Sequence, residues 1–272
     1  MVSGKRAAVT AGVSKIPAQT LGVDSARRAL QVLLLFSGDR PRLSVEEVAS
    51  AIGVSVPSAY RFISLLREMS LVDESGPALY SLTPRVFALT RAAENALQAS
   101  ALFHPLVERL ATTTAEASLV IRRTGDFAIC AAIKQTDAPI RLSFSPGEVM
   151  SLHRGAAPKV LLAYMGAEWA STYFDRIDDP RLPKSERDAI LAELPKIRAR
   201  GWSKSYGEID EGVWAIAAPI KAGEKVIAAV TVAGPHFRIG AKTAQRIQDE
   251  VIKEAFEVSR ELGFAPDDGS SA

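Results

Sequence analysis

A run of hydrogen-bonding side chains at helical spacing is the feature of this sequence with the clearest chemistry. Its polar side carries Ser58, Tyr60, Arg61 and Ser64. Its other side carries apolar residues at intervals of three and four, which predicts an amphipathic helix. Hydroxyl and guanidinium groups hydrogen-bond phosphates and base edges, and this segment has no carboxylate before Glu68. Such a helix face favours insertion into the major groove of double-stranded DNA.

The residues around this segment predict a helix-turn-helix. Ser44 and Glu47 have the spacing of a capping box, and the helical pattern that follows stops at Gly53. Ser55 then begins the next helix, with Pro57 in its first turn, where a missing N–H would have no intrahelical acceptor. Two short amphipathic helices joined by a tight turn containing glycine form this motif. Ser44, Ser55 and Pro57 therefore join the residues expected to contact DNA.

A preceding helix and a following hairpin complete a winged helix. Asp24 can cap a helix whose apolar positions are Ala26, Ala29, Leu30, Leu33 and Leu34. The polar residues 73–78 predict the turn of a hairpin that continues through 79–82. The turn includes two carboxylates, which would repel phosphate. A winged helix that binds only protein therefore stays open as an alternative at this point.

Length and composition predict two domains and exclude several kinds of site. The chain has 272 residues, of which 47% are hydrophobic and 24% charged, with a net charge of +2. Cys130 is the one cysteine and there are three histidines, so we expect no disulfide, no metal site and no structural zinc. The absence of a long apolar run and of a signal peptide predicts a cytoplasmic protein without a membrane partner.

Six segments occur in an order and spacing shared with a known family. They are Asp24-Ser-Ala-Arg-Arg-Ala-Leu, Leu43-Ser-Val-Glu-Glu-Val-Ala, Tyr60-Arg-Phe-Ile-Ser-Leu-Leu, Leu152-His-Arg-Gly-Ala-Ala-Pro-Lys, Gly212-Val-Trp-Ala-Ile-Ala-Ala-Pro-Ile and Val230-Thr-Val-Ala-Gly-Pro. Together they resemble the IclR family of bacterial transcriptional regulators. The resemblance covers roughly residues 22 to 264, nearly the whole chain.

The resemblance implies an α+β chain with an N-terminal winged helix-turn-helix, a linker helix and a C-terminal GAF- or PAS-like domain, in which helices flank an antiparallel sheet. The expected bounds are a disordered basic arm at 1–22, the winged helix at 23–83, the linker helix at 84–102, the effector-binding domain at 103–264 and a disordered tail at 265–272. It also implies a homodimer or homotetramer on a pseudo-palindromic DNA operator, a small organic acid as effector, and no cofactor.

The residues of the C-terminal part are compatible with that fold. Period-two patterns and turns predict strands at 118–123, 127–134, 141–145, 213–219 and 226–233. Helical patterns fit residues 156–165, 185–198 and 241–261. Because consecutive strands are joined by short hairpins, we expect an antiparallel sheet.

The resemblance also implies where the effector lies. Its carboxylate would meet the backbone N–H groups of Ala156 and Ala157 at a helix N-terminus, where the helix dipole favours an anion. Polar contacts would fall at Ser205, Ala215, Thr231 and Ala233, and the apolar wall at Leu142, Met150 and Val213. Here the sequence departs from relatives that bind small oxo acids, because the two alanine side chains cannot donate a hydrogen bond and Ser205 is uncharged. We therefore expect an aromatic or larger hydrophobic carboxylate.

A metabolite-processing enzyme is the rival reading for the C-terminal part. The sequence contains no Gly-rich phosphate loop, no nucleophile elbow and no plausible catalytic pair. We therefore expect no catalytic residue. Each alanine or valine assigned to the pocket is equally compatible with ordinary core packing, and His153 fits a structural histidine better than a catalyst.

Overall fold

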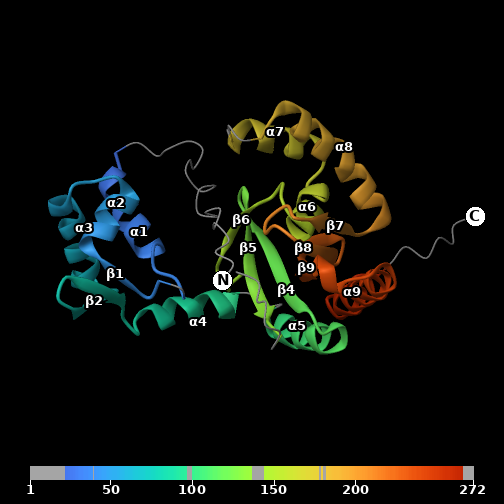
Figure 1. The fold of residues 1–272 in the computed structure, drawn as a ribbon, viewed down its shortest axis with the longest axis horizontal. Helices are drawn as coiled ribbons and strands as arrows, with labels where there is room; N and C mark the ends of the chain where they lie inside the picture. Colours follow the sequence, from blue (N-terminus) through green and yellow to red (C-terminus); the bar gives the residue numbers. More distant parts are fainter. Residues whose placement is uncertain are drawn as a thin grey trace, which may run out of the picture. The chain divides into compact units, whose positions relative to one another are not determined.

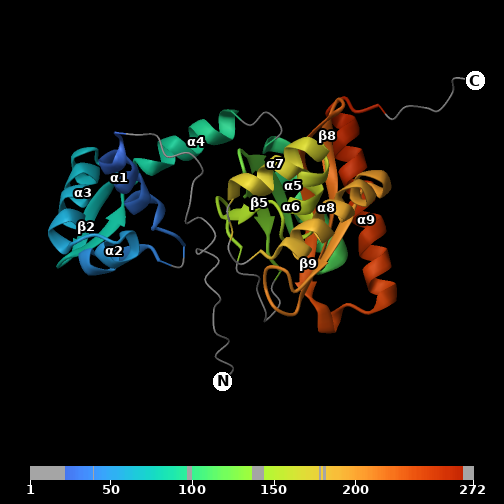
Figure 2. The same ribbon diagram turned by 90° about the horizontal axis from the view of Figure 1, so that it is seen from above.

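The computed structural model describes residues 22–38, 40–96, 100–136, 144–177, 179 and 182–265. The described chain forms two compact units, one ending with the helix at Ala96 and the other beginning at Ser100. Figures 1 and 2 show the elements of both units. The predicted arm and tail lie outside the described residues, apart from Gly22 and Ala265.

The N-terminal unit is a winged helix-turn-helix, as predicted. Its helices are α1 (Asp24–Leu34), α2 (Val45–Ile52) and α3 (Val56–Glu68), followed by α4 (Val86–Ala96). Its strands are β1 (Arg42–Ser44), β2 (Val72–Gly76) and β3 (Leu79–Leu82). They form an antiparallel sheet in the order β1-β3-β2, so the hairpin after α3 pairs with a short strand before α2.

Local hydrogen bonds fix the helix-turn-helix. At the start of α2 the Ser44 Oγ accepts from the Glu47 N–H at 3.2 Å, and the Glu47 carboxylate accepts from the Ser44 N–H at 2.8 Å. This capping box satisfies two amides that the helix cannot pair itself. Gly53 ends α2 with a φ of +65°, a left-handed conformation that suits glycine. The chain can then turn at once into α3.

Three details of the unit differ from the sequence predictions. The buried residues of α1 are Ala29 and Val32, whereas Leu30 and Leu34, assigned to its core face, are exposed. The stripe that packs inward is therefore rotated from the one the leucines suggested. Asp24 lies inside α1 and pairs with Arg27 instead of capping the helix. In the wing, residues 73–76 belong to β2, and the turn is confined to Pro77 and Ala78.

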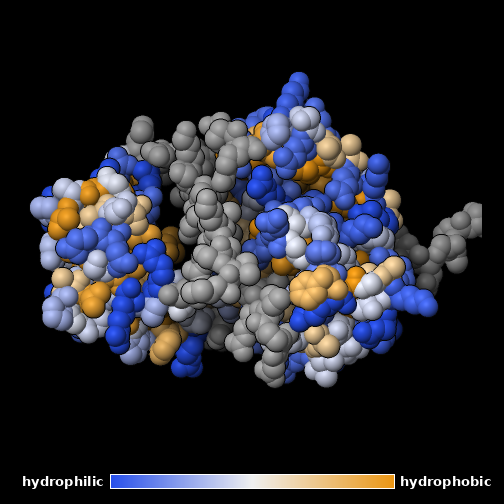
Figure 3. Space-filling model, in the orientation of Figure 1, coloured by the Kyte–Doolittle hydropathy of each residue, from blue (hydrophilic) through white to orange (hydrophobic). Residues whose placement is uncertain are grey.

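Large apolar side chains remain exposed on α4. Phe87 is 69% exposed and Leu89 57%, so one copy of this unit leaves them uncovered. Residues 97–99 of the predicted linker helix lie outside the described residues. Figure 3 shows apolar residues interspersed among hydrophilic ones on one face of both units.

The C-terminal unit is built on a six-stranded sheet. Its strands are β4 (Ala117–Thr124), β5 (Phe127–Lys134), β6 (Val149–Ser151), β7 (Ser203–Tyr206), β8 (Val213–Ala222) and β9 (Lys225–Pro235). Their order is β6-β5-β4-β9-β8-β7, and every neighbouring pair is antiparallel. The pairing of β4 with β9 joins segments about a hundred residues apart in the sequence.

Helices cover both faces of this sheet. One face packs on α5 (Ser100–Thr114) and α9 (Ala241–Glu261), and the other on α6 (Ala156–Ala163), α7 (Ala167–Ile177) and α8 (Lys184–Arg200). A short 3-10 helix, η2 (His236–Arg238), follows β9. Each face has its own apolar core, so the α+β class with flanking helices is confirmed.

One predicted strand is not observed. Of residues 141–145, the first three lie outside the described residues, and Phe144 and Ser145 are not in a strand. The edge strand is β6 instead, which pairs with β5 from Phe127 to Ile129. Among the described residues no single helix is long and apolar enough to span a membrane, and α2 with α3 meets the criterion only as a pair bent by 106°.

Candidate functional site

The outward face of α3 presents the hydrogen-bonding residues that the sequence placed there. Ala59, Ile63 and Leu66 are buried in the core of the N-terminal unit, which leaves Arg61 and Ser64 exposed and Tyr60 41% exposed. No described carboxylate forms an ion pair with Arg61. The first turn of the helix has no acidic residue. The guanidinium group is therefore available to an external acceptor.

The three residues at the helix starts that were predicted to contact DNA have different roles within the unit. Ser55 precedes α3 and exchanges a hydrogen bond with Ser58, their hydroxyl oxygens lying 3.0 Å apart. Pro57 lies in the first turn of α3, as expected. Ser44 caps α2, yet its oxygen acts there as an acceptor, so its hydroxyl proton can still be donated elsewhere.

The wing carries a partly compensated charge. Asp73 of β2 lies 3.9 Å from the Arg67 guanidinium on α3, and both side chains are solvent-exposed. Glu74 is exposed as well. The Arg67 charge offsets one of the two carboxylates that would oppose approach to phosphate.

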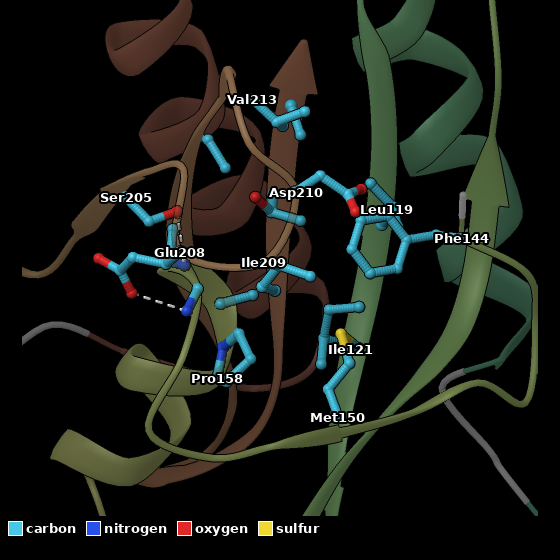
Figure 4. Close-up of a pocket in the computed structure, with 16 residues that line it drawn as sticks. Leu119, Ile121, Phe144, Met150, Pro158, Ser205, Glu208, Ile209, Asp210 and Val213 are labelled. Atoms are coloured by element: carbon cyan, nitrogen blue, oxygen red, sulfur yellow. Dashed lines mark hydrogen bonds between the residues drawn. The ribbon is translucent and has the colours of Figure 1, made fainter. Parts of the chain in front are cut away.

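A cavity lies in the C-terminal unit among α6, the sheet and the loop at 207–212 (Figure 4). Its empty space is about 460 Å³, including the part open to solvent. The lining residues are Leu119, Ile121, Phe144, Met150, Gly155, Ala156, Ala157, Pro158, Ser205, Glu208, Ile209, Asp210, Val213, Ala215, Thr231 and Ala233. Most of these are apolar, and the polar groups are few, which is typical of a small-molecule site.

The N-terminus of α6 forms one end of this cavity. The Ser205 Oγ accepts from the Ala156 N–H at 3.1 Å. The next amide, that of Ala157, donates to no described residue, and Pro158 has no N–H. First-turn amides lack intrahelical acceptors and lie at the positive end of the helix dipole. A ligand anion would find a free donor here.

A carboxylate of the chain binds just before the helix. Glu208 accepts from the Gly155 N–H at 2.8 Å and forms an ion pair with Lys159 at 2.7 Å. The Lys159 side chain is only 6% exposed, and Glu193 of α8 lies 3.2 Å from its Nζ. A buried ammonium requires such partners, because its desolvation is otherwise costly. These contacts attach the loop at 207–212 to the start of α6.

Close packing against Gly155 brings the same loop over the cavity. Gly155 has a φ of +92° and a ψ of 158°, a conformation restricted to glycine. A Cβ at this position would lie 2.6 Å from the Cδ1 of Ile209. The missing side chain therefore allows the isoleucine to contact the backbone directly.

Asp210 from this loop also lines the cavity. Burial raises the pKa of its carboxyl above the ordinary value. In the view of Figure 4 it lies on the side of Leu119 and Phe144, whereas Ser205, Glu208 and Pro158 lie on the other side. The cavity thus has polar groups at separate places.

His153 is buried outside the cavity lining. Its Nδ1 lies 2.8 Å from the Tyr173 hydroxyl, which accepts from the Leu152 N–H at 3.1 Å. A hydroxyl oxygen can accept from two groups, so the direction of the bond to Nδ1 depends on the imidazole tautomer. Burial, and then the charge of Arg154, lower the pKa of His153 to about 4. Its burial outside the cavity lining is compatible with the structural histidine that the sequence suggested.

The structure brings together eight of the nine residues that the family resemblance suggested for the effector site: Met150, Ala156, Ala157, Ser205, Val213, Ala215, Thr231 and Ala233. Leu142 lies outside the described residues. Strand register explains the grouping, because Thr231 pairs with Leu119 and Ala233 with Ala215.

Sequence reasoning missed the other half of the lining. Leu119 and Ile121 had a signal, since they alternate on a predicted strand, but nothing indicated which face they occupy. Glu208, Ile209 and Asp210 belong to a loop between two glycines, where no periodicity predicts a side chain's direction.

Two domain matches decide the family. Residues 25–76 match the IclR helix-turn-helix domain, and residues 93–260 match the domain described as bacterial transcriptional regulator IclR C-terminal. The chain belongs to the IclR family. It is accordingly a DNA-binding transcriptional regulator.

Relatives of this IclR-family regulator match along most of their length. The HTH-type transcriptional regulator KipR of Bacillus subtilis is 24% identical over 241 residues, which cover 87% of this chain and 96% of KipR. The Pca operon regulatory protein of Acinetobacter baylyi is 27% identical over 243 residues, 86% of each chain.

Solved structures share the fold. An IclR homologue from Microbacterium hydrocarbonoxydans complexed with 4-hydroxybenzoate has a TM-score of 0.74 at 17% identity, covering 88% of this chain and 99% of that one. Thermotoga maritima IclR has a TM-score of 0.66 at 20% identity, covering 89% and 100%.

Proposed function

We propose that a small organic acid bound in the cavity of the C-terminal unit modulates the binding of this regulator to its operator. The observation that carries the proposal is the cavity itself, which joins an apolar wall to the free first-turn amide of α6. A pocket with a few placed polar groups and an otherwise apolar lining suits a small ligand of mixed polarity.

The carboxylate of the acid would bind at the α6 end. Ala157 offers its N–H, and Ser205 offers its hydroxyl proton, because its oxygen already accepts from Ala156. The helix dipole adds a favourable potential for an anion. This arrangement binds an acid without burying a further cation in the cavity.

The body of the acid would contact apolar side chains. Leu119, Ile121, Phe144, Met150 and Val213 form the wall, and the small Ala215 and Ala233 leave room beside it. This lining favours an aromatic or larger hydrophobic acid over a small oxo acid. The homologue complexed with 4-hydroxybenzoate supports the same choice.

At the DNA end, we assign the operator contacts to the outward face of α3 and to the adjoining helix starts. Arg61 would read base edges in the major groove, with Ser58, Tyr60 and Ser64 beside it. Ser44, Ser55 and Pro57 would lie close to the phosphates. Residues 23–83 would form the DNA-binding domain and residues 103–264 the effector-binding domain. A homodimer or homotetramer would bind a pseudo-palindromic operator. No catalytic step is needed, consistent with relatives named as regulators.

A gel-shift titration tests the proposal. The probe is a fragment from upstream of the gene, and the acids are benzoate, 4-hydroxybenzoate and phenylacetate. At least one of them should change the affinity of the parent protein for the fragment. Ala215→Phe should fill the cavity and abolish that response, while binding without acid stays within a few-fold of the parent.

Ala222→Phe is the matched control, because it makes the same change on β8 outside the cavity lining. It should respond to the acid like the parent. An Ala215→Phe protein that responds with unaltered acid affinity would place the effector elsewhere and contradict the proposal.

A further inference from the structure

One carboxylate in the cavity lining has no cation or hydrogen-bond donor beside it among the described residues. Asp210 lines the cavity and is half-buried. No described cation or hydrogen-bond donor pairs with its side chain. Because the side chain is only half-buried, solvent can still hydrate its carboxylate, and a ligand that displaces this water would have to supply a donor in its place.

Glu208, a carboxylate of the same loop, does have partners, so the lack of a partner is not a general property of the loop. Glu208, two residues earlier, is neutralised by Lys159 and accepts from the Gly155 N–H. It is therefore already paired within the chain. Asp210 receives neither contact and faces the space that the effector would fill.

The pKa of Asp210 agrees with the lack of a pairing partner. Desolvation is the cause that raises the pKa of its carboxyl, so the side chain has lost water without gaining a compensating donor. A bound ligand would remove more of the remaining water. A purely apolar ligand would then leave the carboxylate both dry and unpaired, which is costly.

We propose that the effector carries a hydrogen-bond donor, a hydroxyl or a protonated amine, on its apolar body, and that Asp210 accepts that bond. The inference rests on the proposed function, because it names the class of acid that the same cavity takes. The acid group would bind at the α6 end, and the donor would lie on the Leu119 and Phe144 side. Asp210 is then a specificity residue for the effector.

Selectivity follows from the cost of leaving the carboxylate unpaired. A site built around a hydrogen bond discriminates against the analogue that lacks the donor more strongly than an apolar wall discriminates by size. A hydroxyl would bond either charged or neutral forms of the side chain. A protonated amine would also offset the second negative charge that the effector's own carboxylate introduces.

Calorimetric titration of the full-length chain with matched acids tests this inference. The probes are benzoate, 3- and 4-hydroxybenzoate, and 3- and 4-(aminomethyl)benzoate, which differ in the donor, in its place and, for the aminomethyl acids, by one methylene group. At least one donor-bearing acid should bind about tenfold or more tightly than benzoate, as expected for a hydrogen bond to a charged group. Asp210→Ala should bring that acid to within about twofold of benzoate.

Two further variants keep the result interpretable. Asp210→Asn retains an acceptor of similar shape, so it should preserve part of the preference for a hydroxyl and lose that for an amine. Glu211→Ala removes the neighbouring exposed carboxylate, which does not line the cavity, and should leave all affinities unchanged.

The outcomes separate this inference from the proposed function. Benzoate binding as tightly as every donor-bearing acid would overturn the role of Asp210 and leave the proposed function standing. A donor preference that persists in a folded Asp210→Ala protein would overturn it too. Binding by none of the acids would contradict the proposed function itself.

Discussion

Arg61 has no ion-pair partner among the described residues and is the one charged residue of α3 between Val56 and Leu66. A guanidinium that makes a bidentate contact with guanine contributes about 1–3 kcal/mol to discrimination among operators. We expect Arg61→Ala to weaken operator binding by that amount, measured by fluorescence anisotropy at one fixed salt concentration.

Arg61→Lys is the informative control, because it keeps the charge and loses the planar fork. It should retain most of the affinity for nonspecific DNA and lose part of the preference for the operator. A folded Arg61→Ala protein with parental affinity would remove Arg61 from the interface.

His153 gives stability a pH dependence whose direction follows from its buried neutral state. Its folded pKa of about 4 lies below the ordinary value of 6.5. Between these two pH values the imidazole is therefore mostly protonated in the unfolded chain and mostly neutral in the folded chain. Stability should therefore be full above pH 6.5 and fall as the pH drops from there towards 4. Between pH 7.5 and pH 5 the loss from this residue should be about 2 kcal/mol.

Urea unfolding at several pH values measures this effect. His153→Gln should flatten the profile by about that difference, because glutamine does not titrate, although it should also lower the stability at neutral pH by disturbing the bond to Tyr173. Parallel profiles for the two proteins would show that His153 is not the group responsible.

Among the elements, the start of α6 depends on one glycine. Gly155 combines a backbone conformation restricted to glycine with a contact that a Cβ would occupy. Gly155→Ala should therefore destabilise the protein by about 1–3 kcal/mol in urea unfolding. Gly223→Ala, at a turn with a φ of +53° and open space around the Cβ position, should cost only about 1 kcal/mol.

A second substitution separates the two contributions at Gly155. Ile209→Ala in the Gly155→Ala background removes the side chain that would clash, so part of the loss should be recovered and the remainder should reflect the backbone. Equal costs at the two glycines, with no recovery, would contradict this explanation.

Capping residues and periodic patterns were sufficient to predict most elements. The capping box at Ser44 and the glycine that ends α2 mark their helix by local hydrogen bonds, which short-range sequence determines. The inward stripe of α1 was assigned correctly at Ala29, but Leu30 and Leu34 are exposed, and Val32, which was not assigned to the stripe, is buried. Which side of a helix packs inward depends on its neighbours in space, and periodicity alone does not contain them.

The same distinction separates the pocket residues that could be predicted from those that could not. Residues at α6 and on β8 and β9 were assigned through the family resemblance, and Ala215 and Ala233 lie side by side because β8 and β9 pair in that register. The loop residue Asp210 has no such constraint. Its position results from the attachment of Glu208 to Gly155 and Lys159, a contact between segments about fifty residues apart.

At the level of the whole molecule, we predict self-association from the exposed apolar side chains. Phe87 and Leu89 on α4, like Leu34 on α1, are more than half exposed in one chain. We expect light scattering at micromolar concentration to give at least twice the mass of one chain. The operator should then have half-sites centred about 10 base pairs apart, or a multiple of it.

A Phe87→Ser/Leu89→Ser protein should associate more weakly than the parent, because these substitutions remove apolar area that a second copy would cover. A parent protein that stays monomeric at micromolar concentration would contradict the expected symmetry of the operator.

The division of the pocket between main chain and side chain bears on how readily its selectivity can be altered. On the proposed function, the acid group is held chiefly by the Ala157 amide, which no substitution except proline removes. The rest of the effector meets side chains that single mutations replace. A library restricted to Asp210, Ala215 and Phe144 should therefore yield biosensors for different carboxylic acids while each variant keeps its requirement for a carboxylate.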